Sequence, residues 1–283
     1  MSDDAGNTAR KALALIRRNR QQILDHIRER EMQTYAGNAV HCVICKHSFS
    51  RFAPYHAWHV MPPVGPEKEP VLECRSNEAI ARCPNCGSQE RQRLLWKYLH
   101  DATDIFRSGG IRLLEIAPDK YFYHAFSNQE GIAYYPCDLN PDQDKYIREK
   151  MSVRREDATR LQLEDDYFDV ILCNHVLEHI PDEERALQEL YRVMKPGGWG
   201  IFQVPLDPDR ALTWEDPEIH EPWARQQAYG QHDHVRLYGR DYPMRLERHG
   251  FTVILDTFVM QMTEADRLRY GLDPREVIYR CSK

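Results

Sequence analysis

The 283-residue sequence has no long apolar run and no surplus of positive charge. No stretch reaches the roughly 18 consecutive apolar residues that a membrane-spanning helix needs. The N-terminal stretch MSDDAGNTARK lacks the apolar segment of a secretory signal, so we expect a cytoplasmic protein with no membrane partner. The formal net charge of −6 argues against a nucleic-acid partner, because affinity for phosphate backbones comes mainly from Lys and Arg.

Glycine is missing where a nucleotide-binding α/β domain would be expected to have it. The stretch IRLLEIAPDKYF, residues 111–122, is typical of a buried strand that ends in Glu115 and then turns. That turn holds Ala117, Pro118 and Asp119 instead of a glycine-rich loop. Because proline fixes φ and has no N–H, the sequence leaves open whether a cofactor binds here.

The first 36 residues are expected to form an amphipathic helix. Apolar residues recur at helical spacing within 8–32, with arginine-rich positions between them. We interpret this helix as packing on the body of the protein or on a second subunit, which makes a homodimer an alternative. A basic arm that contacts nucleic acid is the less favoured interpretation.

The eight cysteines point to metal ligands or free thiols rather than disulfides, because no export signal precedes them. Two CxxC pairs supply four thiolates, which is the ligand set of a structural Zn²⁺. Four sulfur ligands leave no open position, so this ion would hold structure rather than do chemistry. Cys74 is an alternative ligand, and four unrelated thiols are the competing interpretation. The predicted ligands are Cys42, Cys45, Cys83 and Cys86, in a zinc-binding module with a connecting helix over residues 37–104.

From Gly110 onward, predicted strands and helices alternate, which indicates an α/β fold with a parallel sheet covered on both faces. Cys137, Cys173 and Cys281 fall on predicted strands and are expected to be small core residues. The helix that joins this region to the cysteines is expected over residues 88–100. The predicted strands are 111–116, 132–138, 168–173, 199–205, 251–260 and 276–281.

The most specific signal lies in residues 157–205. YFDVILCN is typical of a buried strand, VLEH of a turn, and PDEERALQELYRVMK of an amphipathic helix that PGG ends before the strand WGIFQVP. This segment resembles the class I S-adenosylmethionine-dependent methyltransferases, specifically the type 11 group. The resemblance implies a Rossmann-like seven-stranded sheet with helices on both faces, over residues 105–283.

The resemblance also implies a set of S-adenosylmethionine-binding residues at the strand ends. Glu115 matches the acid near the cofactor's α-amino group, and Asp138 matches the carboxylate on the ribose hydroxyls. Asp157 matches the acid that contacts the adenine amino group. Taken singly, each acid is also common in helix caps and turns. The full set is Glu115, Ala117, Pro118, Asp138, Leu139, Asp157, Ala158 and Asn174.

The stretch HVLEH, residues 175–179, fits the pattern of inverted zinc proteases. That pattern needs a helix, whereas these residues directly follow a predicted strand and precede Pro181, so we do not favour it. Some ubiquinone-pathway O-methyltransferases have a similar junction that binds a divalent ion. This resemblance implies a second metal site at His175, Glu178 and His179, with satisfied junction residues as the alternative.

An insertion over residues 206–238 leaves the carboxyl end of a predicted strand, the edge where α/β sheets bind ligands. Its aromatic and titratable residues predict a lid over the methyl acceptor. Methyl transfer requires a base for the acceptor's proton, and a histidine suits that role. We expect His232 or His234 to be this base, and His175 next. The competing interpretation is that His232 and His234 only hydrogen-bond the loop backbone.

The leading functional hypothesis is a methyltransferase that transfers a methyl group from S-adenosylmethionine to a small-molecule or glycan acceptor by O-methylation. RNA methylation is an alternative, because some ribosomal-RNA methyltransferases also carry a four-cysteine zinc module. A third reading is a zinc-anchored binding protein that has lost its cofactor, given the missing glycines.

Overall fold

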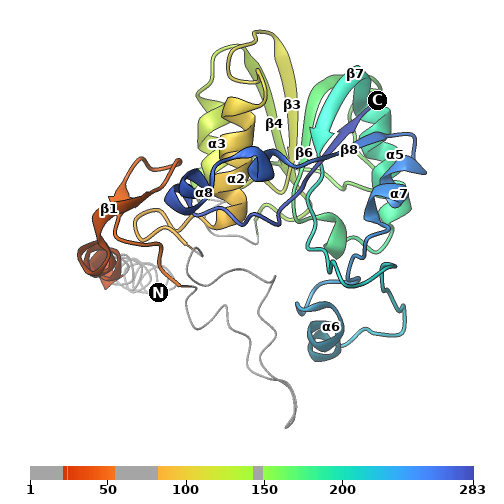
Figure 1. Ribbon diagram of the computed structural model, residues 1–283. Helices are drawn as coiled ribbons and strands as arrows, with labels where there is room; N and C mark the ends of the chain where they lie inside the picture. The colour runs from red at the N-terminus through yellow and green to blue at the C-terminus, as the bar shows by residue number, and fades with distance from the viewer. Residues whose placement is uncertain (1–21, 24, 55–81, 143–148) are drawn as a thin grey trace, which may run out of the picture.

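The computed structural model describes residues 22–23, 25–54, 82–142 and 149–283 (Figure 1). A helix covers 22–23 and 25–34, in agreement with the C-terminal part of the predicted amphipathic helix. Residues 1–21 and Cys74 lie outside the described residues. None of the helices in the described ranges is both long and apolar enough to cross a membrane.

The centre of the molecule is a seven-stranded sheet with the order β5-β4-β3-β6-β7-β9-β8. The first five of these strands run parallel, and β9 is antiparallel to both β7 and β8. The predicted seven-stranded Rossmann-like sheet is therefore confirmed. Its strands are β3 (Ile111–Ile116), β4 (Ile132–Asp138), β5 (Arg154–Arg155), β6 (Phe168–Cys173), β7 (Met194–Ile201), β8 (Thr252–Asp256) and β9 (Ile278–Ser282).

Helices cover both faces of this sheet (Figure 1). The α-helices are α2 (Glu90–Asp101), α3 (Lys120–Ser127), α5 (Glu183–Val193), α6 (Pro222–Tyr229), α7 (Tyr242–Glu247) and α8 (Glu264–Tyr270). Two short 3₁₀ helices are η2 (Leu177–His179) and η3 (Phe258–Gln261).

The central strands are buried on both faces, which explains their almost continuous apolar sequence. On β3, Leu113 packs into the core beneath α2 and α3, whereas Leu114 packs into the opposite core beneath α5 and α7. The same alternation continues on β6, where Val170 faces the first core and Ile171 the second. Period-two alternation therefore divides one apolar strand between two cores.

Three strands begin and end where the sequence predicts them, but β7 does not. It begins at Met194, so the Pro-Gly-Gly sequence lies within the strand rather than before it. The pairing with β6 shifts between Phe168–Met194 and Val170–Trp199, and Gly197 has a φ of +79°. The glycines thus form an irregularity in β7 rather than a helix stop.

A small module built on the cysteines lies beside α2 (Figure 1). Its strands β1 (Ala36–His41) and β2 (Ser48–Phe49) pair antiparallel, and α8 contacts β1. Arg93 of α2 is completely buried where the module meets the C-terminal part of the chain. Its guanidinium donates to the carbonyls of Tyr270 and Gly271 and lies 3.9 Å from the ring centroid of Phe52.

Candidate active site

The predicted cofactor residues follow the carboxyl ends of four adjacent strands. Asp157 follows β5, Asp138 ends β4, Ala117 follows β3 and Asn174 follows β6. Because β5, β4, β3 and β6 are neighbours and parallel, these residues share one edge of the sheet. Ligands of open α/β sheets bind at this edge, so the sequence-predicted set is arranged as a cofactor site requires.

The first loop closes without glycine because Ala117 adopts the left-handed conformation itself, with a φ of +51°. Its N–H donates to the Cys137 carbonyl over 2.7 Å, which ties the loop to β4. Asp119 then caps α3 by accepting a 2.8 Å hydrogen bond from the Tyr121 N–H. The loop is therefore held by specific hydrogen bonds in place of glycine's conformational freedom.

Glu115 is 3% exposed, and its carboxylate lies beneath the first loop. It accepts hydrogen bonds from the Tyr134 hydroxyl over 2.5 Å and from the Asp119 N–H over 3.4 Å. Burial raises its pKa to about 8, and none of the groups that contribute to this shift is a cation. Glu115 is thus a buried carboxylate with no cation beside it. The positively charged α-amino group of S-adenosylmethionine could supply that cation.

Three further predicted residues fit a bound cofactor. The Oδ1 atom of Asn174 is buried and has no hydrogen-bond partner among the described residues. Asp138 accepts a 2.7 Å hydrogen bond from the Asn140 N–H on Oδ1, which orients its carboxylate at the strand end. Leu139 beside it is exposed, as an apolar surface for a ligand would be.

The residues predicted to bind adenine lie on the turn after β5. Asp157 is exposed and accepts hydrogen bonds from the N–H and hydroxyl of Thr159 on Oδ1. Ala158 is buried next to it. Pro118, on the first loop, is also buried. The structure thus places every predicted cofactor residue at the expected edge of the sheet.

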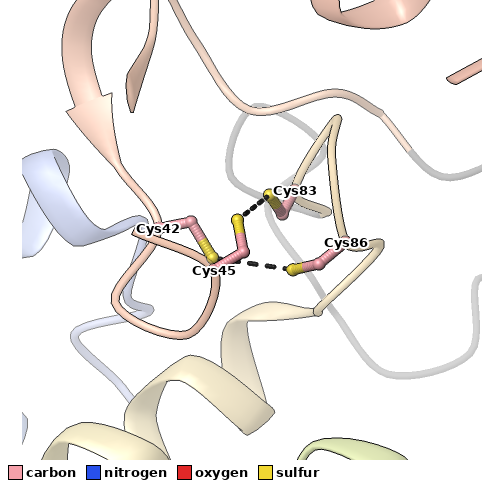
Figure 2. A group of neighbouring side chains, drawn as sticks. All are labelled: Cys42, Cys45, Cys83 and Cys86. Atoms are coloured by element: carbon pink, nitrogen blue, oxygen red, sulfur yellow. Dashed lines mark hydrogen bonds between the residues drawn. The ribbon is translucent and has the colours of Figure 1, made fainter. Parts of the chain in front are cut away.

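The four predicted zinc ligands form one cluster in which all sulfurs lie within 4.8 Å of one another. Figure 2 shows the two CxxC turns facing each other. The Sγ atoms of Cys42 and Cys86 are 3.7 Å apart, and those of Cys45 and Cys83 are 3.6 Å apart. A tetrahedral zinc with about 2.3 Å bonds needs sulfurs about 3.8 Å apart, so this cluster fits the ion.

The junction after β6 brings titratable side chains against the insertion. His175 has a φ of +57°, and its Nδ1 lies 3.5 Å from Oε1 of Glu178. Burial lowers the pKa of His175. Burial alone would raise the pKa of Glu178, but His175 and His179 beside it hold that pKa below its usual range.

The structure changes the membership of the predicted second metal site. Glu178, His179 and His234 have ligand atoms within 4.8 Å of one another, and among the described residues His175 is not part of this group. His234 comes from the insertion and lies about 55 residues after His179 in the sequence. The 175–179 segment contains only the short 3₁₀ helix η2, so the helical arrangement required by the protease interpretation is absent from this segment.

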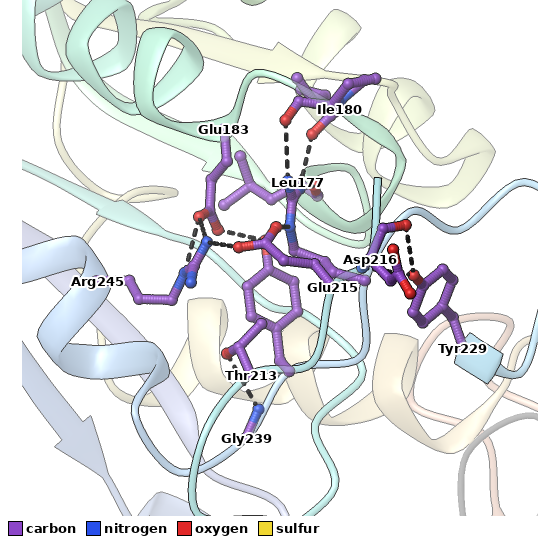
Figure 3. A network of polar contacts seen from close by, with 12 residues as sticks. Leu177, Ile180, Glu183, Thr213, Glu215, Asp216, Tyr229, Gly239 and Arg245 are labelled. Carbon is purple, nitrogen blue, oxygen red and sulfur yellow. Dashed lines mark hydrogen bonds and ion pairs between the residues drawn. The ribbon is translucent and has the colours of Figure 1, made fainter. Parts of the chain in front are cut away.

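The insertion is anchored on the junction by a polar network (Figure 3). Arg236, 3% exposed, donates to the carbonyls of Leu177 and Ile180 and to Glu215. Figure 3 shows Glu215 beside Arg245, which also pairs with the buried Glu183. Sequence reasoning missed Arg236 as an anchor, although it lies in the quoted stretch GQHDHVRLYG.

The three predicted catalytic histidines lie in different environments. The His232 side chain is 60% exposed. His234 is buried, and its Nδ1 lies 3.3 Å from the Tyr229 carbonyl, which matches the interpretation that it hydrogen-bonds the loop backbone. Of the three, His175 lies at the carboxyl end of a central strand with a carboxylate beside its ring.

Part of the chain is similar to known proteins. Residues 117–202 match the family model described as a methyltransferase domain. Over this stretch the chain is similar to methyltransferase domains. An arsenite methyltransferase from Aquipseudomonas alcaligenes is 37% identical over 97 residues, which cover 34% of this chain and 26% of that protein. A demethylmenaquinone methyltransferase from Streptomyces avermitilis is 50% identical over 71 residues, covering 24% and 31%.

A solved structure of an S-adenosylmethionine-dependent methyltransferase from Archaeoglobus fulgidus is 19% identical, with a TM-score of 0.45, and covers 70% of this chain and 95% of that one. The chain spans between about a quarter and a third of the two curated relatives described above. The similarity to methyltransferases therefore rests on the matched part of the chain.

Proposed function

We propose that the protein transfers a methyl group from S-adenosylmethionine to an oxygen of a small-molecule or glycan acceptor. One observation carries this proposal. The predicted cofactor residues line the carboxyl edge of the sheet, and the histidine-rich junction at the same edge is covered by the insertion. Cofactor and acceptor would therefore meet between β6 and the insertion.

The cofactor, when bound, supplies an electrophilic methyl group on a sulfonium. Glu115 would hold its α-amino group, Asp138 its ribose hydroxyls and Asp157 its adenine amino group. The buried Oδ1 of Asn174, which has no hydrogen-bond partner among the described residues, and the lack of a cation among the groups that shift the pKa of Glu115 support this orientation. Binding at these points fixes the direction in which the methyl group faces the acceptor.

His175 is the base that the geometry favours. Attack by the acceptor oxygen forms a carbon–oxygen bond as the carbon–sulfur bond breaks, and the hydroxyl proton must leave. With Nδ1 directed to Glu178, the Nε2 atom of His175 is the one left to accept that proton. Because burial lowers its pKa, the ring is neutral and able to accept a proton near pH 7.

The acceptor class follows from charge. The net charge of −6 disfavours a polyanionic acceptor. Asp233 of the insertion lies 3.3 Å from His179 of the junction, which further disfavours phosphate-rich partners. A hydroxylated small molecule or glycan meets no such repulsion.

We propose that the cysteine cluster binds a structural Zn²⁺. The sulfur–sulfur distances support this, since they match the edges of a zinc–sulfur tetrahedron. Four protein ligands would leave no position for substrate, so the ion would stabilise the module.

Calorimetric titration of zinc-loaded protein with S-adenosylhomocysteine tests the cofactor site. We expect micromolar binding, which Asp138→Ala abolishes while the fold is retained. Asp101→Ala, on the exposed end of α2, is the control and should bind as the wild type does. Absence of binding to folded wild-type protein would reject the enzyme and support a cofactor-free binding protein.

The acceptor is sought by transfer of radiolabelled methyl groups to panels of hydroxylated small molecules and oligosaccharides. Label that appears in RNA instead, with salt-sensitive retention of the protein on RNA, would contradict the proposed acceptor class.

A further inference from the structure

A histidine–carboxylate cluster lies where the insertion covers the junction after β6. Its members are Glu178 and His179 from the junction and His234 from the insertion, and their ligand atoms lie within 4.8 Å of one another. When three atoms lie no more than 4.8 Å apart, an ion placed between them can lie within about 2.8 Å of each atom. Shifts of less than about 1 Å would bring them to the about 2.0–2.2 Å of zinc–ligand bonds.

The Nδ1 atoms of both histidines lie beside oxygen acceptors. Nδ1 of His179 lies 3.3 Å from Oδ2 of Asp233, and Nδ1 of His234 lies 3.3 Å from the Tyr229 carbonyl. Each acceptor favours the tautomer with hydrogen on Nδ1, which leaves the Nε2 lone pair available. Metal-binding histidines in proteins are oriented by such carboxylate and carbonyl partners.

Glu178 supplies a second, independent sign of a missing ligand. It is 1% exposed, and its Oε2 atom is buried with no hydrogen-bond partner among the described residues. Its other oxygen, Oε1, lies 3.5 Å from His175 and 4.0 Å from Nε2 of His179. A buried carboxylate oxygen without a partner is costly, so a cluster of satisfied junction residues does not account for it.

The backbone around the cluster is fixed from both sides. The Val235 N–H donates to the Glu178 carbonyl over 2.8 Å, next to His234. Arg236 donates to the Leu177 and Ile180 carbonyls, on either side of Glu178 and His179. The two segments are therefore locked together at the residues that carry the ligands, as a preorganised metal site requires.

We propose that Glu178, His179 and His234 bind one divalent transition-metal ion. Two imidazoles and one carboxylate suit zinc or iron(II), and three protein ligands leave positions open for a substrate oxygen. This set differs from the one expected from sequence, because His234 takes the place of His175. His175 remains free to act as the base beside the ion.

The ion would bind an oxygen of the acceptor, a role that rests on the proposed methyl transfer. A metal-bound hydroxyl loses its proton more readily, so the ion would favour acceptors with a hydroxyl able to coordinate it. Metal binding itself does not depend on the methyltransferase activity and is tested separately.

Cobalt(II) is the probe, titrated into full-length protein whose cysteine cluster is loaded with zinc. We expect one Co²⁺ per chain, with ligand-field absorption and no sulfur-to-metal charge-transfer band. Native mass spectrometry should show the zinc retained. A sulfur charge-transfer band, or no binding at all, would overturn the proposal, because cobalt would then have displaced zinc or found no second site.

Variants assign the ligands. Glu178→Gln and His234→Ala should weaken Co²⁺ binding by more than about a hundredfold. Asp233→Asn, which keeps the side chain's size but removes the charge beside Nδ1 of His179, should weaken it by about tenfold. His220→Ala, an exposed histidine of the same insertion, is the matched control and should bind cobalt as the wild type does. Wild-type affinity in the ligand variants would reject the assignment.

Two checks keep the outcomes separate. If His234→Ala does not fold, as judged by near-ultraviolet circular dichroism, His179→Ala provides the same test. S-adenosylhomocysteine titration of the same samples reports the cofactor site alone. Cobalt binding without S-adenosylhomocysteine binding would reject the proposed function and leave the metal site standing.

Discussion

The hydroxyl of Tyr121 donates a 2.5 Å hydrogen bond to the backbone carbonyl of Cys86. Tyr121 lies in the first turn of α3, directly after the loop that lacks glycine, and Cys86 belongs to the cysteine cluster. Gln92 of α2 also contacts Asp119 of that loop. The cysteine module is therefore joined to the cofactor loop by two side-chain contacts.

Removing the Tyr121 hydroxyl should loosen both ends of this contact. Tyr121→Phe leaves the Cys86 carbonyl without its donor, so we expect a loss of about 0.5–1.5 kcal/mol in unfolding free energy. We also expect faster zinc release to a chelator and weaker S-adenosylhomocysteine binding. The control is Tyr123→Phe, on the same helix as Tyr121. This variant removes the hydroxyl that accepts a hydrogen bond from the Ser152 N–H. Equal zinc release from both variants would contradict the coupling.

Position 117 should tolerate substitution by glycine better than substitution by any branched residue. A left-handed φ costs a non-glycine residue about 1–2 kcal/mol, while glycine loses about 0.5–1 kcal/mol in chain entropy. Ala117→Gly should therefore raise the unfolding free energy by up to about 1 kcal/mol, and Ala117→Val should lower it. Urea denaturation measures both. The control is Ala133→Gly, at an exposed position of β4, which should lower the unfolding free energy. A similar decrease for Ala117→Gly would show that the backbone at residue 117 is not strained.

Glu115 should make stability fall as pH rises through neutrality. Burial raises its folded-state pKa from 4.5 to about 8, so the folded protein keeps a proton that the unfolded chain loses. The retained proton adds to the unfolding free energy. This stabilisation is fully present below about pH 4.5 and is lost as pH rises to about 8, at up to about 1.4 kcal/mol per pH unit. Urea denaturation of wild type and Glu115→Gln across pH 5–9 measures it. The difference between the two proteins should change with pH, and a constant difference would be inconsistent with the raised pKa.

Arg236 should be essential for the position of the insertion. Arg236→Ala leaves the Leu177 and Ile180 carbonyls without this donor and leaves Glu215 to Arg245 alone, so we expect a loss of about 2–4 kcal/mol in unfolding free energy. Arg236→Lys should recover little, because an ammonium cannot reproduce the guanidinium fork. Thermal unfolding compares both with Arg240→Ala, an exposed arginine with one carbonyl contact. A loss no larger than that control would mean that Arg236 does not anchor the insertion.

His175 should control turnover more than acceptor binding. If it accepts the hydroxyl proton, His175→Ala should lower kcat by about 10²–10⁴-fold, with a smaller change in KM. His232→Ala should have little effect, since that side chain is largely exposed. Steady-state kinetics on the identified acceptor gives both constants. A larger effect at His232 would reassign the base.

The sequence predicted every parallel strand except the two-residue β5, because the apolar runs of the others are short and bounded by acids and turns. The bounds of β3, β4 and β6 agree with the expectation. The cysteine cluster was also predictable, since the CxxC spacing fixes the geometry of each ligand pair. β7 was placed too late, because its Pro-Gly-Gly sequence is typical of a helix stop and only the pairing with β6 reveals the irregularity.

The contacts between distant segments could not be predicted. His234 meets Glu178 only because Arg236 and Val235 fix the insertion on the junction, and no periodicity marks that path. The hydrogen bond from Tyr121 to Cys86 likewise depends on how the module packs. Such contacts are set by tertiary structure, where local patterns carry no information.

The buried guanidinium of Arg93 has a consequence for synthesis on the ribosome. Two of its acceptors, the carbonyls of Tyr270 and Gly271, are translated 177 and 178 residues after it. The nascent chain exposes both cysteine pairs early, yet this charge lacks those acceptors until residues 270 and 271 have been synthesised. Completion of the module must therefore wait for this later segment, and chains truncated before residue 270 should be recognised by chaperones even with zinc bound.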